Sequence, residues 1–116
     1  NNTERFHIMS LPLDHTQPVF RALADPTRRA IIMLLADKDL RVGDIAARFE
    51  MTRPAVAKHL AVLKSADLIH VSQAGRERIN HLNPAALKAA TDWLAWFDRF
   101  WDDRLAALKS AVEKDT

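Results

Sequence analysis

Apolar residues recur at helical spacing along most of this chain, and only one segment alternates as strands do. The first predicted helix begins at Thr16, whose hydroxyl could cap it. Its apolar face consists of Val19, Phe20 and Leu23. Asp25 followed by Pro26 signals the start of a second helix, because an aspartate accepts N–H groups of the first turn and proline has no N–H to lose there. This second helix carries a cluster of isoleucines and leucines and ends near Asp37.

Two further helices are predicted, with a very short link between them. The first is short, and its apolar positions are Val42, Ile45, Ala46 and Phe49. Its start signal is weak, because Arg41 occupies the place of a capping Ser or Thr. Thr52 then caps a longer helix over residues 52–67, whose buried face repeats at +4 and +3 through Val56, Leu60 and Leu63. Two helices joined by about three residues form a helix-turn-helix, whose second helix enters the major groove of DNA.

A β-hairpin is predicted directly after this helix pair. Residues 68–73 and 77–82 are rich in strand-forming side chains and flank Ala74-Gly75-Arg76, where Gly75 can supply the positive φ of a tight turn. A hairpin in this position is a wing. The predicted fold class is therefore mainly α, a winged helix-turn-helix with a two-stranded wing.

The C-terminal region is predicted to hold the dimer interface. Asn83-Pro84 repeats the helix-start signal, and Thr91-Asp92 could cap a second, long helix over about residues 92–113. One apolar stripe and a second apolar face at the start of that helix exceed what one side of a small domain can bury, and such patches mark association sites. We expect a symmetric homodimer. Its interface would consist of Trp93, Leu94, Phe97, Trp101, Leu105 and Leu108, with Trp96 and Phe100 beside them.

Length and composition fit one soluble globular domain of 116 residues, with 48% hydrophobic and 28% charged residues. Within residues 1–116 we assign 16–83 to the helix-turn-helix and wing, and 84–116 to dimerisation helices. No apolar run is long enough for a membrane span, and the polar start of the chain lacks a secretory signal, so we expect a cytoplasmic protein. The residues ahead of Met9 carry no weight in this assignment.

The distribution of charge is more informative than the net charge of +2. Residues 52–82 contain five Lys and Arg against two Asp and Glu, whereas residues 84–116 contain five against six. The basic half is the half that holds the predicted helix-turn-helix, as expected of a DNA-binding protein.

Three motifs, in the right order over roughly residues 16–82, resemble the ArsR family of bacterial winged-helix repressors. They are Asp25-Pro26-Thr27-Arg28-Arg29, the run from Thr52 to Leu60, and Gly75-Arg76-Glu77-Arg78. The aromatic C-terminal helix, with Trp93-Leu94, Phe100-Trp101 and Arg104-Leu105, is similar to a metal-independent branch of that family. The resemblance implies a repressor that blocks polymerase. Glu50 departs from the pattern, because the turn of the family often has glycine there, and a left-handed backbone at glutamate costs about 1 kcal/mol.

The residues expected to contact DNA come from the recognition helix and the wing. The outward side of the helix is small and basic, which lets it lie close to the duplex while cations meet phosphates or guanine edges. The expected contacts are Thr52, Arg53, Pro54, Ala57 and Lys58 in the helix, and Gln73, Arg76 and Arg78 in the wing. Glu77 should point away from phosphate or pair with an arginine. Thr27, Arg28 and Arg29 could hold a phosphate at a helix start, although an intramolecular salt bridge is an equal alternative.

Metal binding and catalysis are not expected. Metal-sensing members of the family use a cysteine pair before the turn, or Asp and His on the C-terminal helix. This chain has no cysteine, and its long helix has no histidine, so we expect no metal and no cofactor. His70 and His81 could meet across the hairpin, but two ligands do not close a site, and His59 is expected to be a packing residue. The sequence has no nucleophile–base pair, phosphate-binding loop or paired carboxylates, so no enzyme is predicted.

The sequence thus predicts a homodimeric transcriptional repressor that binds double-stranded DNA at an inverted-repeat operator. Two alternatives remain open. One is a sensor of a metal or of an unknown small-molecule effector that binds at a site different from those of the family, for example a hydrophobic pocket among Trp93, Trp96 and Phe100. The other is a dimer whose helix-turn-helix binds protein rather than DNA.

Overall fold

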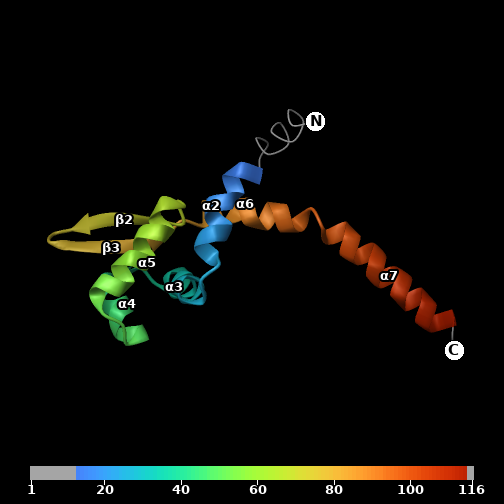
Figure 1. Cartoon of the computed structure of the whole chain (residues 1–116), viewed down its shortest axis with the longest axis horizontal. Coiled ribbons are helices and arrows are strands. Elements are labelled where there is room, and N and C mark those ends of the chain that lie inside the picture. Colours follow the sequence, from blue (N-terminus) through green and yellow to red (C-terminus); the bar gives the residue numbers. More distant parts are fainter. Residues whose placement is uncertain (1–12, 115–116) are drawn as a thin grey trace.

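The computed structural model describes residues 13–114, and side chains from Thr16 onward; the N-terminal residues around Met9 lie outside this range. The chain forms a helical body with a small sheet and a separate C-terminal helix, as Figure 1 shows. Its elements are α2 (Leu13–Leu23), α3 (Pro26–Asp37), β1 (Leu40–Arg41), α4 (Val42–Phe49), α5 (Arg53–Ser65), β2 (Ile69–Ala74), β3 (Glu77–Leu82), α6 (Pro84–Ala95) and α7 (Asp98–Lys114). The predicted mainly α, winged helix-turn-helix fold is confirmed.

The core lies between α3, α4, α5 and the base of the hairpin. The side chains with no more than 2% exposure come from each of these elements, so they hold the helix pair and the wing in one packed unit. They include Ile31, Ile45, Val56, Leu63, Leu68 and Ile69. The predicted buried face of the recognition helix is confirmed, because Val56, Leu60 and Leu63 are its buried residues.

The sheet has three antiparallel strands in the order β1-β3-β2. The hairpin β2–β3 is the predicted wing, with Gly75 at φ +64° in its turn. The short strand β1 was not predicted, and it pairs with the base of the wing through Leu40 opposite Asn80 and Arg41 opposite Ile79. Asn80 is 3% exposed, and its Nδ2 donates to the Leu40 carbonyl at 3.1 Å. The wing is therefore tied to the body at its base.

The turn between α4 and α5 has the left-handed backbone that is unfavourable for a glutamate. Glu50 adopts a left-handed backbone, with φ 54° and ψ 41°, so the position does need positive φ and a glutamate occupies it. Thr52 caps α5 as predicted, since its Oγ1 accepts the Ala55 N–H at 3.3 Å. The side chain of Arg41 accepts no N–H group of the first turn of α4, as expected from the weak start signal. The Arg41 N–H itself donates to Asp44 Oδ2 at 3.4 Å.

The prediction for the start of the first helix is wrong. α2 begins at Leu13, so Thr16 lies inside the helix, and it is buried rather than placed as a cap. Asp25 does cap α3, because its Oδ1 accepts the N–H groups of Thr27 at 2.7 Å and Arg28 at 3.2 Å. The second helix has its predicted bounds, Pro26–Asp37.

The predicted long C-terminal helix is present as α7, but its predicted start near residue 92 is wrong. α6 continues through Thr91 and Asp92, and the break comes later, at Trp96 and Phe97. Neither predicted capping residue is placed to cap: the Thr91 hydroxyl donates back to the Leu87 carbonyl at 3.1 Å, and Asp92 pairs with the Lys88 ammonium at 2.9 Å. Both contacts are typical of a helix interior.

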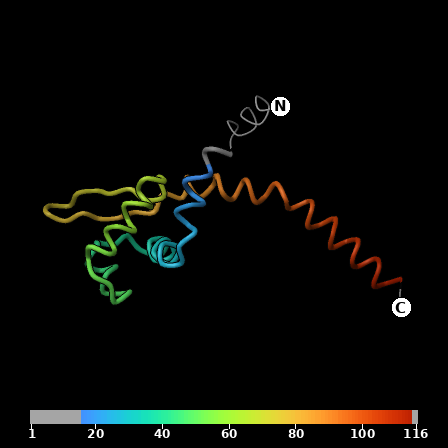
Figure 2. The backbone as a smooth tube through the Cα atoms, in the orientation of Figure 1, coloured from blue at the N-terminus to red at the C-terminus, as the bar shows by residue number. Residues whose placement is uncertain are grey.

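α7 extends away from the body, at the opposite end of the molecule from the wing (Figures 1 and 2). None of its residues is buried. The radius of gyration is 19.7 Å, against about 13 Å for a compact domain of this size. Among the described helices, none is long and apolar enough to cross a membrane.

Candidate nucleic-acid interface

The recognition helix α5 presents the predicted residues on its outer side. Thr52, Arg53, Pro54, Ala57 and Lys58 are all exposed, whereas Val56, between them in sequence, is fully buried. The helical period separates these two sets, so the apolar residues hold α5 on the core and the small and basic residues face outward. Figure 1 places this helix beside the wing.

The wing brings its arginines toward the start of the recognition helix. Arg76 and Arg78 line a cleft together with Arg53 and with the first turn of α4, so residues from three separate segments converge there. Gln73 is exposed near the hairpin turn, where its Nε2 donates to the Gly75 carbonyl at 3.4 Å. The structure thus collects the predicted helix and wing residues at one end of the molecule.

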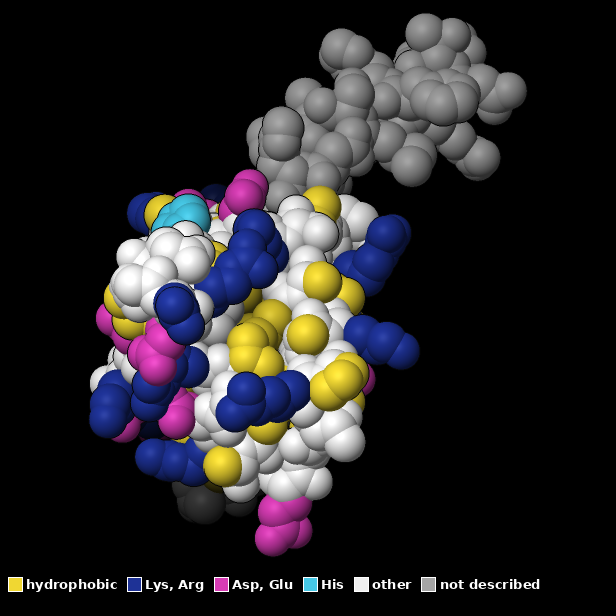
Figure 3. All heavy atoms as spheres, turned by 90° about the vertical axis from the view of Figure 1, so that its left-hand side faces the viewer, with side chains coloured by type: hydrophobic (Ala, Val, Ile, Leu, Met, Phe, Trp, Pro, Cys, Tyr) yellow, Lys and Arg dark blue, Asp and Glu magenta, His cyan; other side chains and the backbone are white. Residues whose placement is uncertain are grey.

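A second cleft runs between α5 and the inner face of the wing. Small or branched apolar side chains line its floor, and Lys64 and Arg78 lie at its edge. The apolar residues include Ala57, Ala61, Ile69 and Val71. Figure 3 views this end of the protein and shows apolar side chains in the centre with lysines and arginines around them. Such a surface can approach a duplex closely while cations meet its phosphates.

Sequence reasoning missed Arg41, which lies in the first cleft, with Arg53, Arg76 and Arg78. Its guanidinium binds Asp44 Oδ2 through Nε at 3.1 Å and Glu77 Oε1 through Nη1 at 2.6 Å. The hydrogen bond to Asp44, followed by that to Glu77, raises the pKa of Arg41, and the bonds from Arg41 lower the pKa of Asp44. The expectation that Glu77 pairs with an arginine is met. The i,i+3 spacing of Arg41 and Asp44 was the one local signal in the sequence, because Glu77 is far away along the chain.

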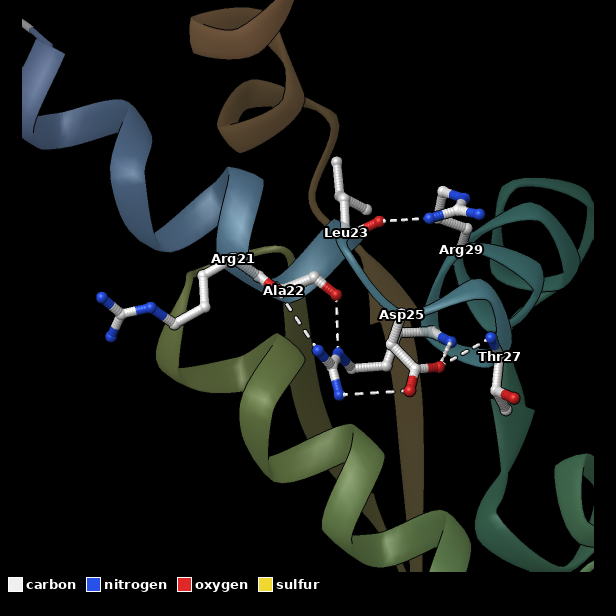
Figure 4. Close-up of polar contacts among 7 residues, drawn as sticks. Arg21, Ala22, Leu23, Asp25, Thr27 and Arg29 are labelled. Carbon is white, nitrogen blue, oxygen red and sulfur yellow. Dashed lines mark hydrogen bonds and ion pairs between the residues drawn. The ribbon is translucent and has the colours of Figure 1, made fainter.

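Thr27, Arg28 and Arg29, considered above for phosphate binding, make intramolecular contacts at the joint between α2 and α3 (Figure 4). Arg28 donates from Nε to the Ala22 carbonyl at 2.6 Å and from Nη2 to the Arg21 carbonyl at 3.2 Å. Arg29 donates to the Leu23 carbonyl at 2.8 Å. Cations at the C-terminal end of a helix complement its dipole, so both arginines close α2.

Asp25 completes this joint from the other side. Its Oδ2 lies 3.8 Å from Arg28 Nη1, in addition to the two backbone bonds that cap α3. The N–H of Arg28, with that of Thr27, lowers the pKa of the Asp25 carboxyl against a smaller opposing effect of burial. Because Asp25 already accepts the N–H groups of residues 27 and 28, the structure favours the salt-bridge alternative over a phosphate site.

The histidines form no metal cluster among the described residues. His70 and His81 are register partners on β2 and β3, as predicted. His81 contacts Ser72 Oγ through Nε2 at 2.6 Å and Asp39 Oδ2 through Nδ1 at 3.0 Å. His59 is half-buried, in line with a packing role.

The residues predicted to form a dimer interface are divided by the break at Trp96 and Phe97. Trp93 and Leu94 lie on α6, and Trp101, Leu105 and Leu108 lie on α7, where each is about 60% exposed. Phe97 is half-buried between Trp93 and Trp96, with ring centroids 5.0 and 4.9 Å away. Trp93 also meets Phe20 of α2 at 5.5 Å. The six residues therefore form two adjoining apolar surfaces rather than one stripe.

Comparison with known proteins identifies the family. The model of the family described as "Bacterial regulatory protein, arsR family" matches residues 25–71, from the cap of α3 into the wing. The HTH-type transcriptional regulator Rv2034 of Mycobacterium tuberculosis is 41% identical over 96 residues, covering 83% of this chain and 87% of that protein. The transcriptional repressor SdpR of Bacillus subtilis is 37% identical over 87 residues, covering 75% and 97%.

A solved structure agrees with these relatives in fold. The homodimeric winged helix-turn-helix DNA-binding domain Mb0332 of Mycobacterium bovis superposes with a TM-score of 0.64 at 25% identity, covering 77% of this chain and 85% of that domain. Three findings point to the same family: the sequence identity to Rv2034 over most of both chains, the match of the family model to the helix-turn-helix, and the fold shared with Mb0332. This chain belongs to the arsR family of bacterial regulatory proteins and is a transcriptional regulator.

Proposed function

We propose that this protein is a homodimeric repressor that binds an inverted-repeat operator through α5 and the wing β2–β3. The observation that carries the proposal is the convergence of Arg53, Arg76 and Arg78 in one cleft. Within the described part of the chain, none of these three arginines has an ion-pair partner, so their charges are available to an external anion. A polyanionic duplex is the partner that such a surface attracts.

The roles of the DNA-facing residues follow from where each is placed. Arg53, at the first position of α5, is suited to read a guanine edge, because the start of a recognition helix enters the major groove. Lys58 and the wing arginines would contact phosphates, and Ala57 would let the helix approach closely. The proposed contact set remains Thr52, Arg53, Pro54, Ala57, Lys58, Gln73, Arg76 and Arg78.

The homodimer would use α6 and α7. Trp93, Leu94, Phe97, Trp101, Leu105 and Leu108 offer an apolar surface that is too exposed for a protein working alone, and Mb0332 is a homodimer of the same fold. We treat residues 1–116 as one domain, with 16–83 as the reading unit and 84–116 as the dimerisation segment. Two reading units related by a two-fold axis would contact half-sites about 34 Å apart, or a multiple of it.

The proposal includes a cytoplasmic location, where the DNA of a bacterium lies, and no catalytic activity. It also places the protein in a metal-independent branch, because neither cysteines nor a histidine-bearing C-terminal helix are present. Operator binding should therefore be unchanged by Zn²⁺, Ni²⁺, arsenite and chelators. A chelator-reversible change of tenfold or more would instead favour a metal sensor.

The function is tested by operator selection from a random DNA pool, followed by binding assays on three variants. Arg53→Ala should weaken binding about 5- to 150-fold and relax base preference at one or two positions, since a bidentate guanine contact contributes about 1–3 kcal/mol. Lys58→Ala should weaken all sequences alike and flatten the salt dependence. Trp101→Asp, which leaves every DNA-facing residue in place, should sediment as a monomer and lose tight operator binding.

Three results would each contradict a different part of the proposal. Unchanged affinity and base preference in Arg53→Ala would remove the recognition-helix assignment. A wild-type dimer from Trp101→Asp would show that α7 is not the interface. If binding of the protein to DNA does not depend on salt concentration, the helix-turn-helix has a protein partner in place of DNA.

A further inference from the structure

Gly43 lies in the first turn of α4, and the Arg53 guanidinium lies directly against it. A Cβ atom at residue 43 would come within 2.9 Å of Nη2, 3.2 Å of Cζ and 3.4 Å of Nε of Arg53. Because a Cβ does not approach a non-bonded atom as closely as 2.9 Å, every other residue at position 43 would displace this guanidinium. The two residues lie on different helices, on either side of the turn at Glu50.

The backbone of α4 gives no reason for glycine at this position. Residue 43 is helical, and among the described glycines only Gly75 has a positive φ. Glycine weakens a helix relative to alanine, because it has more conformational freedom to lose on folding. The space needed by Arg53 is what accounts for glycine here.

The guanidinium of Arg53 is held by no polar partner in the free protein. It lies beside the N-terminal turn of α4, where the helix dipole is positive, and shares a cleft with Arg76 and Arg78. The two carboxylates of that cleft, Asp44 and Glu77, are bound by Arg41 instead. Among the described residues it has no hydrogen-bond or ion-pair partner. Contact with Gly43 therefore limits where the side chain can lie, while a bond to an acceptor is left for a ligand to supply.

We infer that Gly43 is a positioning residue for DNA recognition: its missing side chain lets Arg53 lie against α4 and present its guanidinium to a base edge at the start of the recognition helix. The inference rests on the proposed function. It adds a specificity-determining residue that lies outside the recognition helix and donates nothing to DNA itself.

The test is Gly43→Ala in the full chain. The arginine side chain is flexible, so it can move away from the new methyl group and the fold is kept; the melting temperature should stay equal or rise, because α4 gains helix propensity. Operator affinity should nevertheless fall at least fivefold. Base preference should relax at the same position that Arg53→Ala relaxes. If Gly43 had a merely structural role, its replacement would lower the melting temperature and the operator affinity together. A lower affinity at an equal or higher melting temperature would therefore not come from such a role.

Two further variants isolate the mechanism. In the Arg53→Ala background, Gly43→Ala should cause no additional loss of affinity, because the residue through which it acts is absent. Ala47→Gly is the matched control, since it changes helix propensity at an exposed position of the same helix, one turn beyond Gly43, that does not line the cleft of Arg53. It should lower the melting temperature and leave affinity and base preference unchanged.

Several results would overturn the inference. If Arg53→Ala impairs binding but Gly43→Ala does not, Gly43 does not position the arginine, and the proposed function stands. If Gly43→Ala lowers the melting temperature, or weakens binding equally without Arg53, glycine is needed for another reason. If Arg53→Ala itself changes nothing, the role proposed for Arg53 fails first.

Discussion

Glu77→Gln should strengthen DNA binding, although Glu77 makes the shortest ion pair of the wing. In the free protein its carboxylate holds Arg41 at 2.6 Å, inside the cleft that also contains Arg53 and the wing arginines. The carboxylate therefore repels phosphate and occupies a cation that phosphate could use. The neutral amide of glutamine removes the repulsion and ends the ion pair at Arg41 Nη1, while Arg41 Nε keeps its bond to Asp44 at 3.1 Å.

The loss of folding stability should be small. Both side chains are about half exposed, 49% for Arg41 and 54% for Glu77, and exposed pairs contribute about 0–1 kcal/mol. The wing does not depend on this pair, because β1 pairs with β3 and the buried Asn80 bonds to the Leu40 carbonyl. We expect the melting temperature to fall by at most about 5 °C.

The gain in binding has two parts. A carboxylate about 10 Å from a phosphate opposes it by about 0.4 kcal/mol in water, which is about twofold in affinity. Arg41 Nη1, no longer held by a carboxylate, adds a contact, and each neutralised phosphate steepens the slope of log K against log salt by about 0.9. Together we expect about two- to tenfold tighter binding at low salt, for operator and unrelated DNA alike.

Fluorescence anisotropy on labelled operator, repeated over a series of salt concentrations, measures both parts. The control is Arg41→Ala with and without Glu77→Gln, because the steeper slope should vanish when Arg41 is absent. Weaker binding by Glu77→Gln, or an unchanged slope, would refute the reasoning. Weaker binding would show that the ion pair holds the wing in its working position, and an unchanged slope would show that Arg41 adds no phosphate contact.

Three further predictions concern stability, and thermal or urea unfolding measures all of them. Asp25→Ala should lower the melting temperature at neutral pH through loss of the α3 cap. The folded-state pKa of Asp25 is lowered, so its contribution is complete above about pH 4 and is lost as the pH falls further; the variant should be less sensitive to acid in that range. Asn80→Leu should cost about 1–3 kcal/mol, because the Leu40 carbonyl loses its donor. Glu50→Gly should stabilise the protein by up to about 1 kcal/mol, since glycine adopts φ 54° without strain, and a loss of stability would contradict this.

The parts of the fold that the sequence predicted correctly depend on local signals. Asp25 followed by Pro26 marks α3 and Thr52 marks α5, because a cap and the N–H groups it accepts lie within one turn of each other. Gly75 marks the wing for the same reason. The outer side of α5 follows from the helical period alone.

The errors have two sources: one element is defined by pairing with a distant segment, and the C-terminal helices carry ambiguous local signals. β1 has two residues, too few to alternate, and is defined by its pairing with Asn80 and Ile79 some 40 residues later. Thr91 can begin a helix or continue one, and here it bonds back to Leu87. The break at Trp96 has neither glycine nor proline to announce it.

The same distinction applies to the candidate interface. The exposed cations of α5 and the wing were predicted, because their exposure follows from position within an element. The contact of Arg53 with Gly43 and the pairing of Arg41 with Glu77 were not, since each joins different elements. The dimerisation residues stay a prediction, and the structure divides them between two helices.

The joint between α2 and α3 bears on how such a protein could change its target. α2 packs on α6 through Phe20 and Trp93, on the side proposed for dimerisation, whereas α3 packs on α5 and β3, which carry the proposed DNA contacts. Arg28 fixes the angle between them by bonding the last carbonyls of α2. In a homodimer this angle sets how far apart the two recognition helices lie. Substitutions at the joint could therefore alter the number of base pairs between half-sites while every base contact stays the same, so spacing and sequence preference can evolve separately.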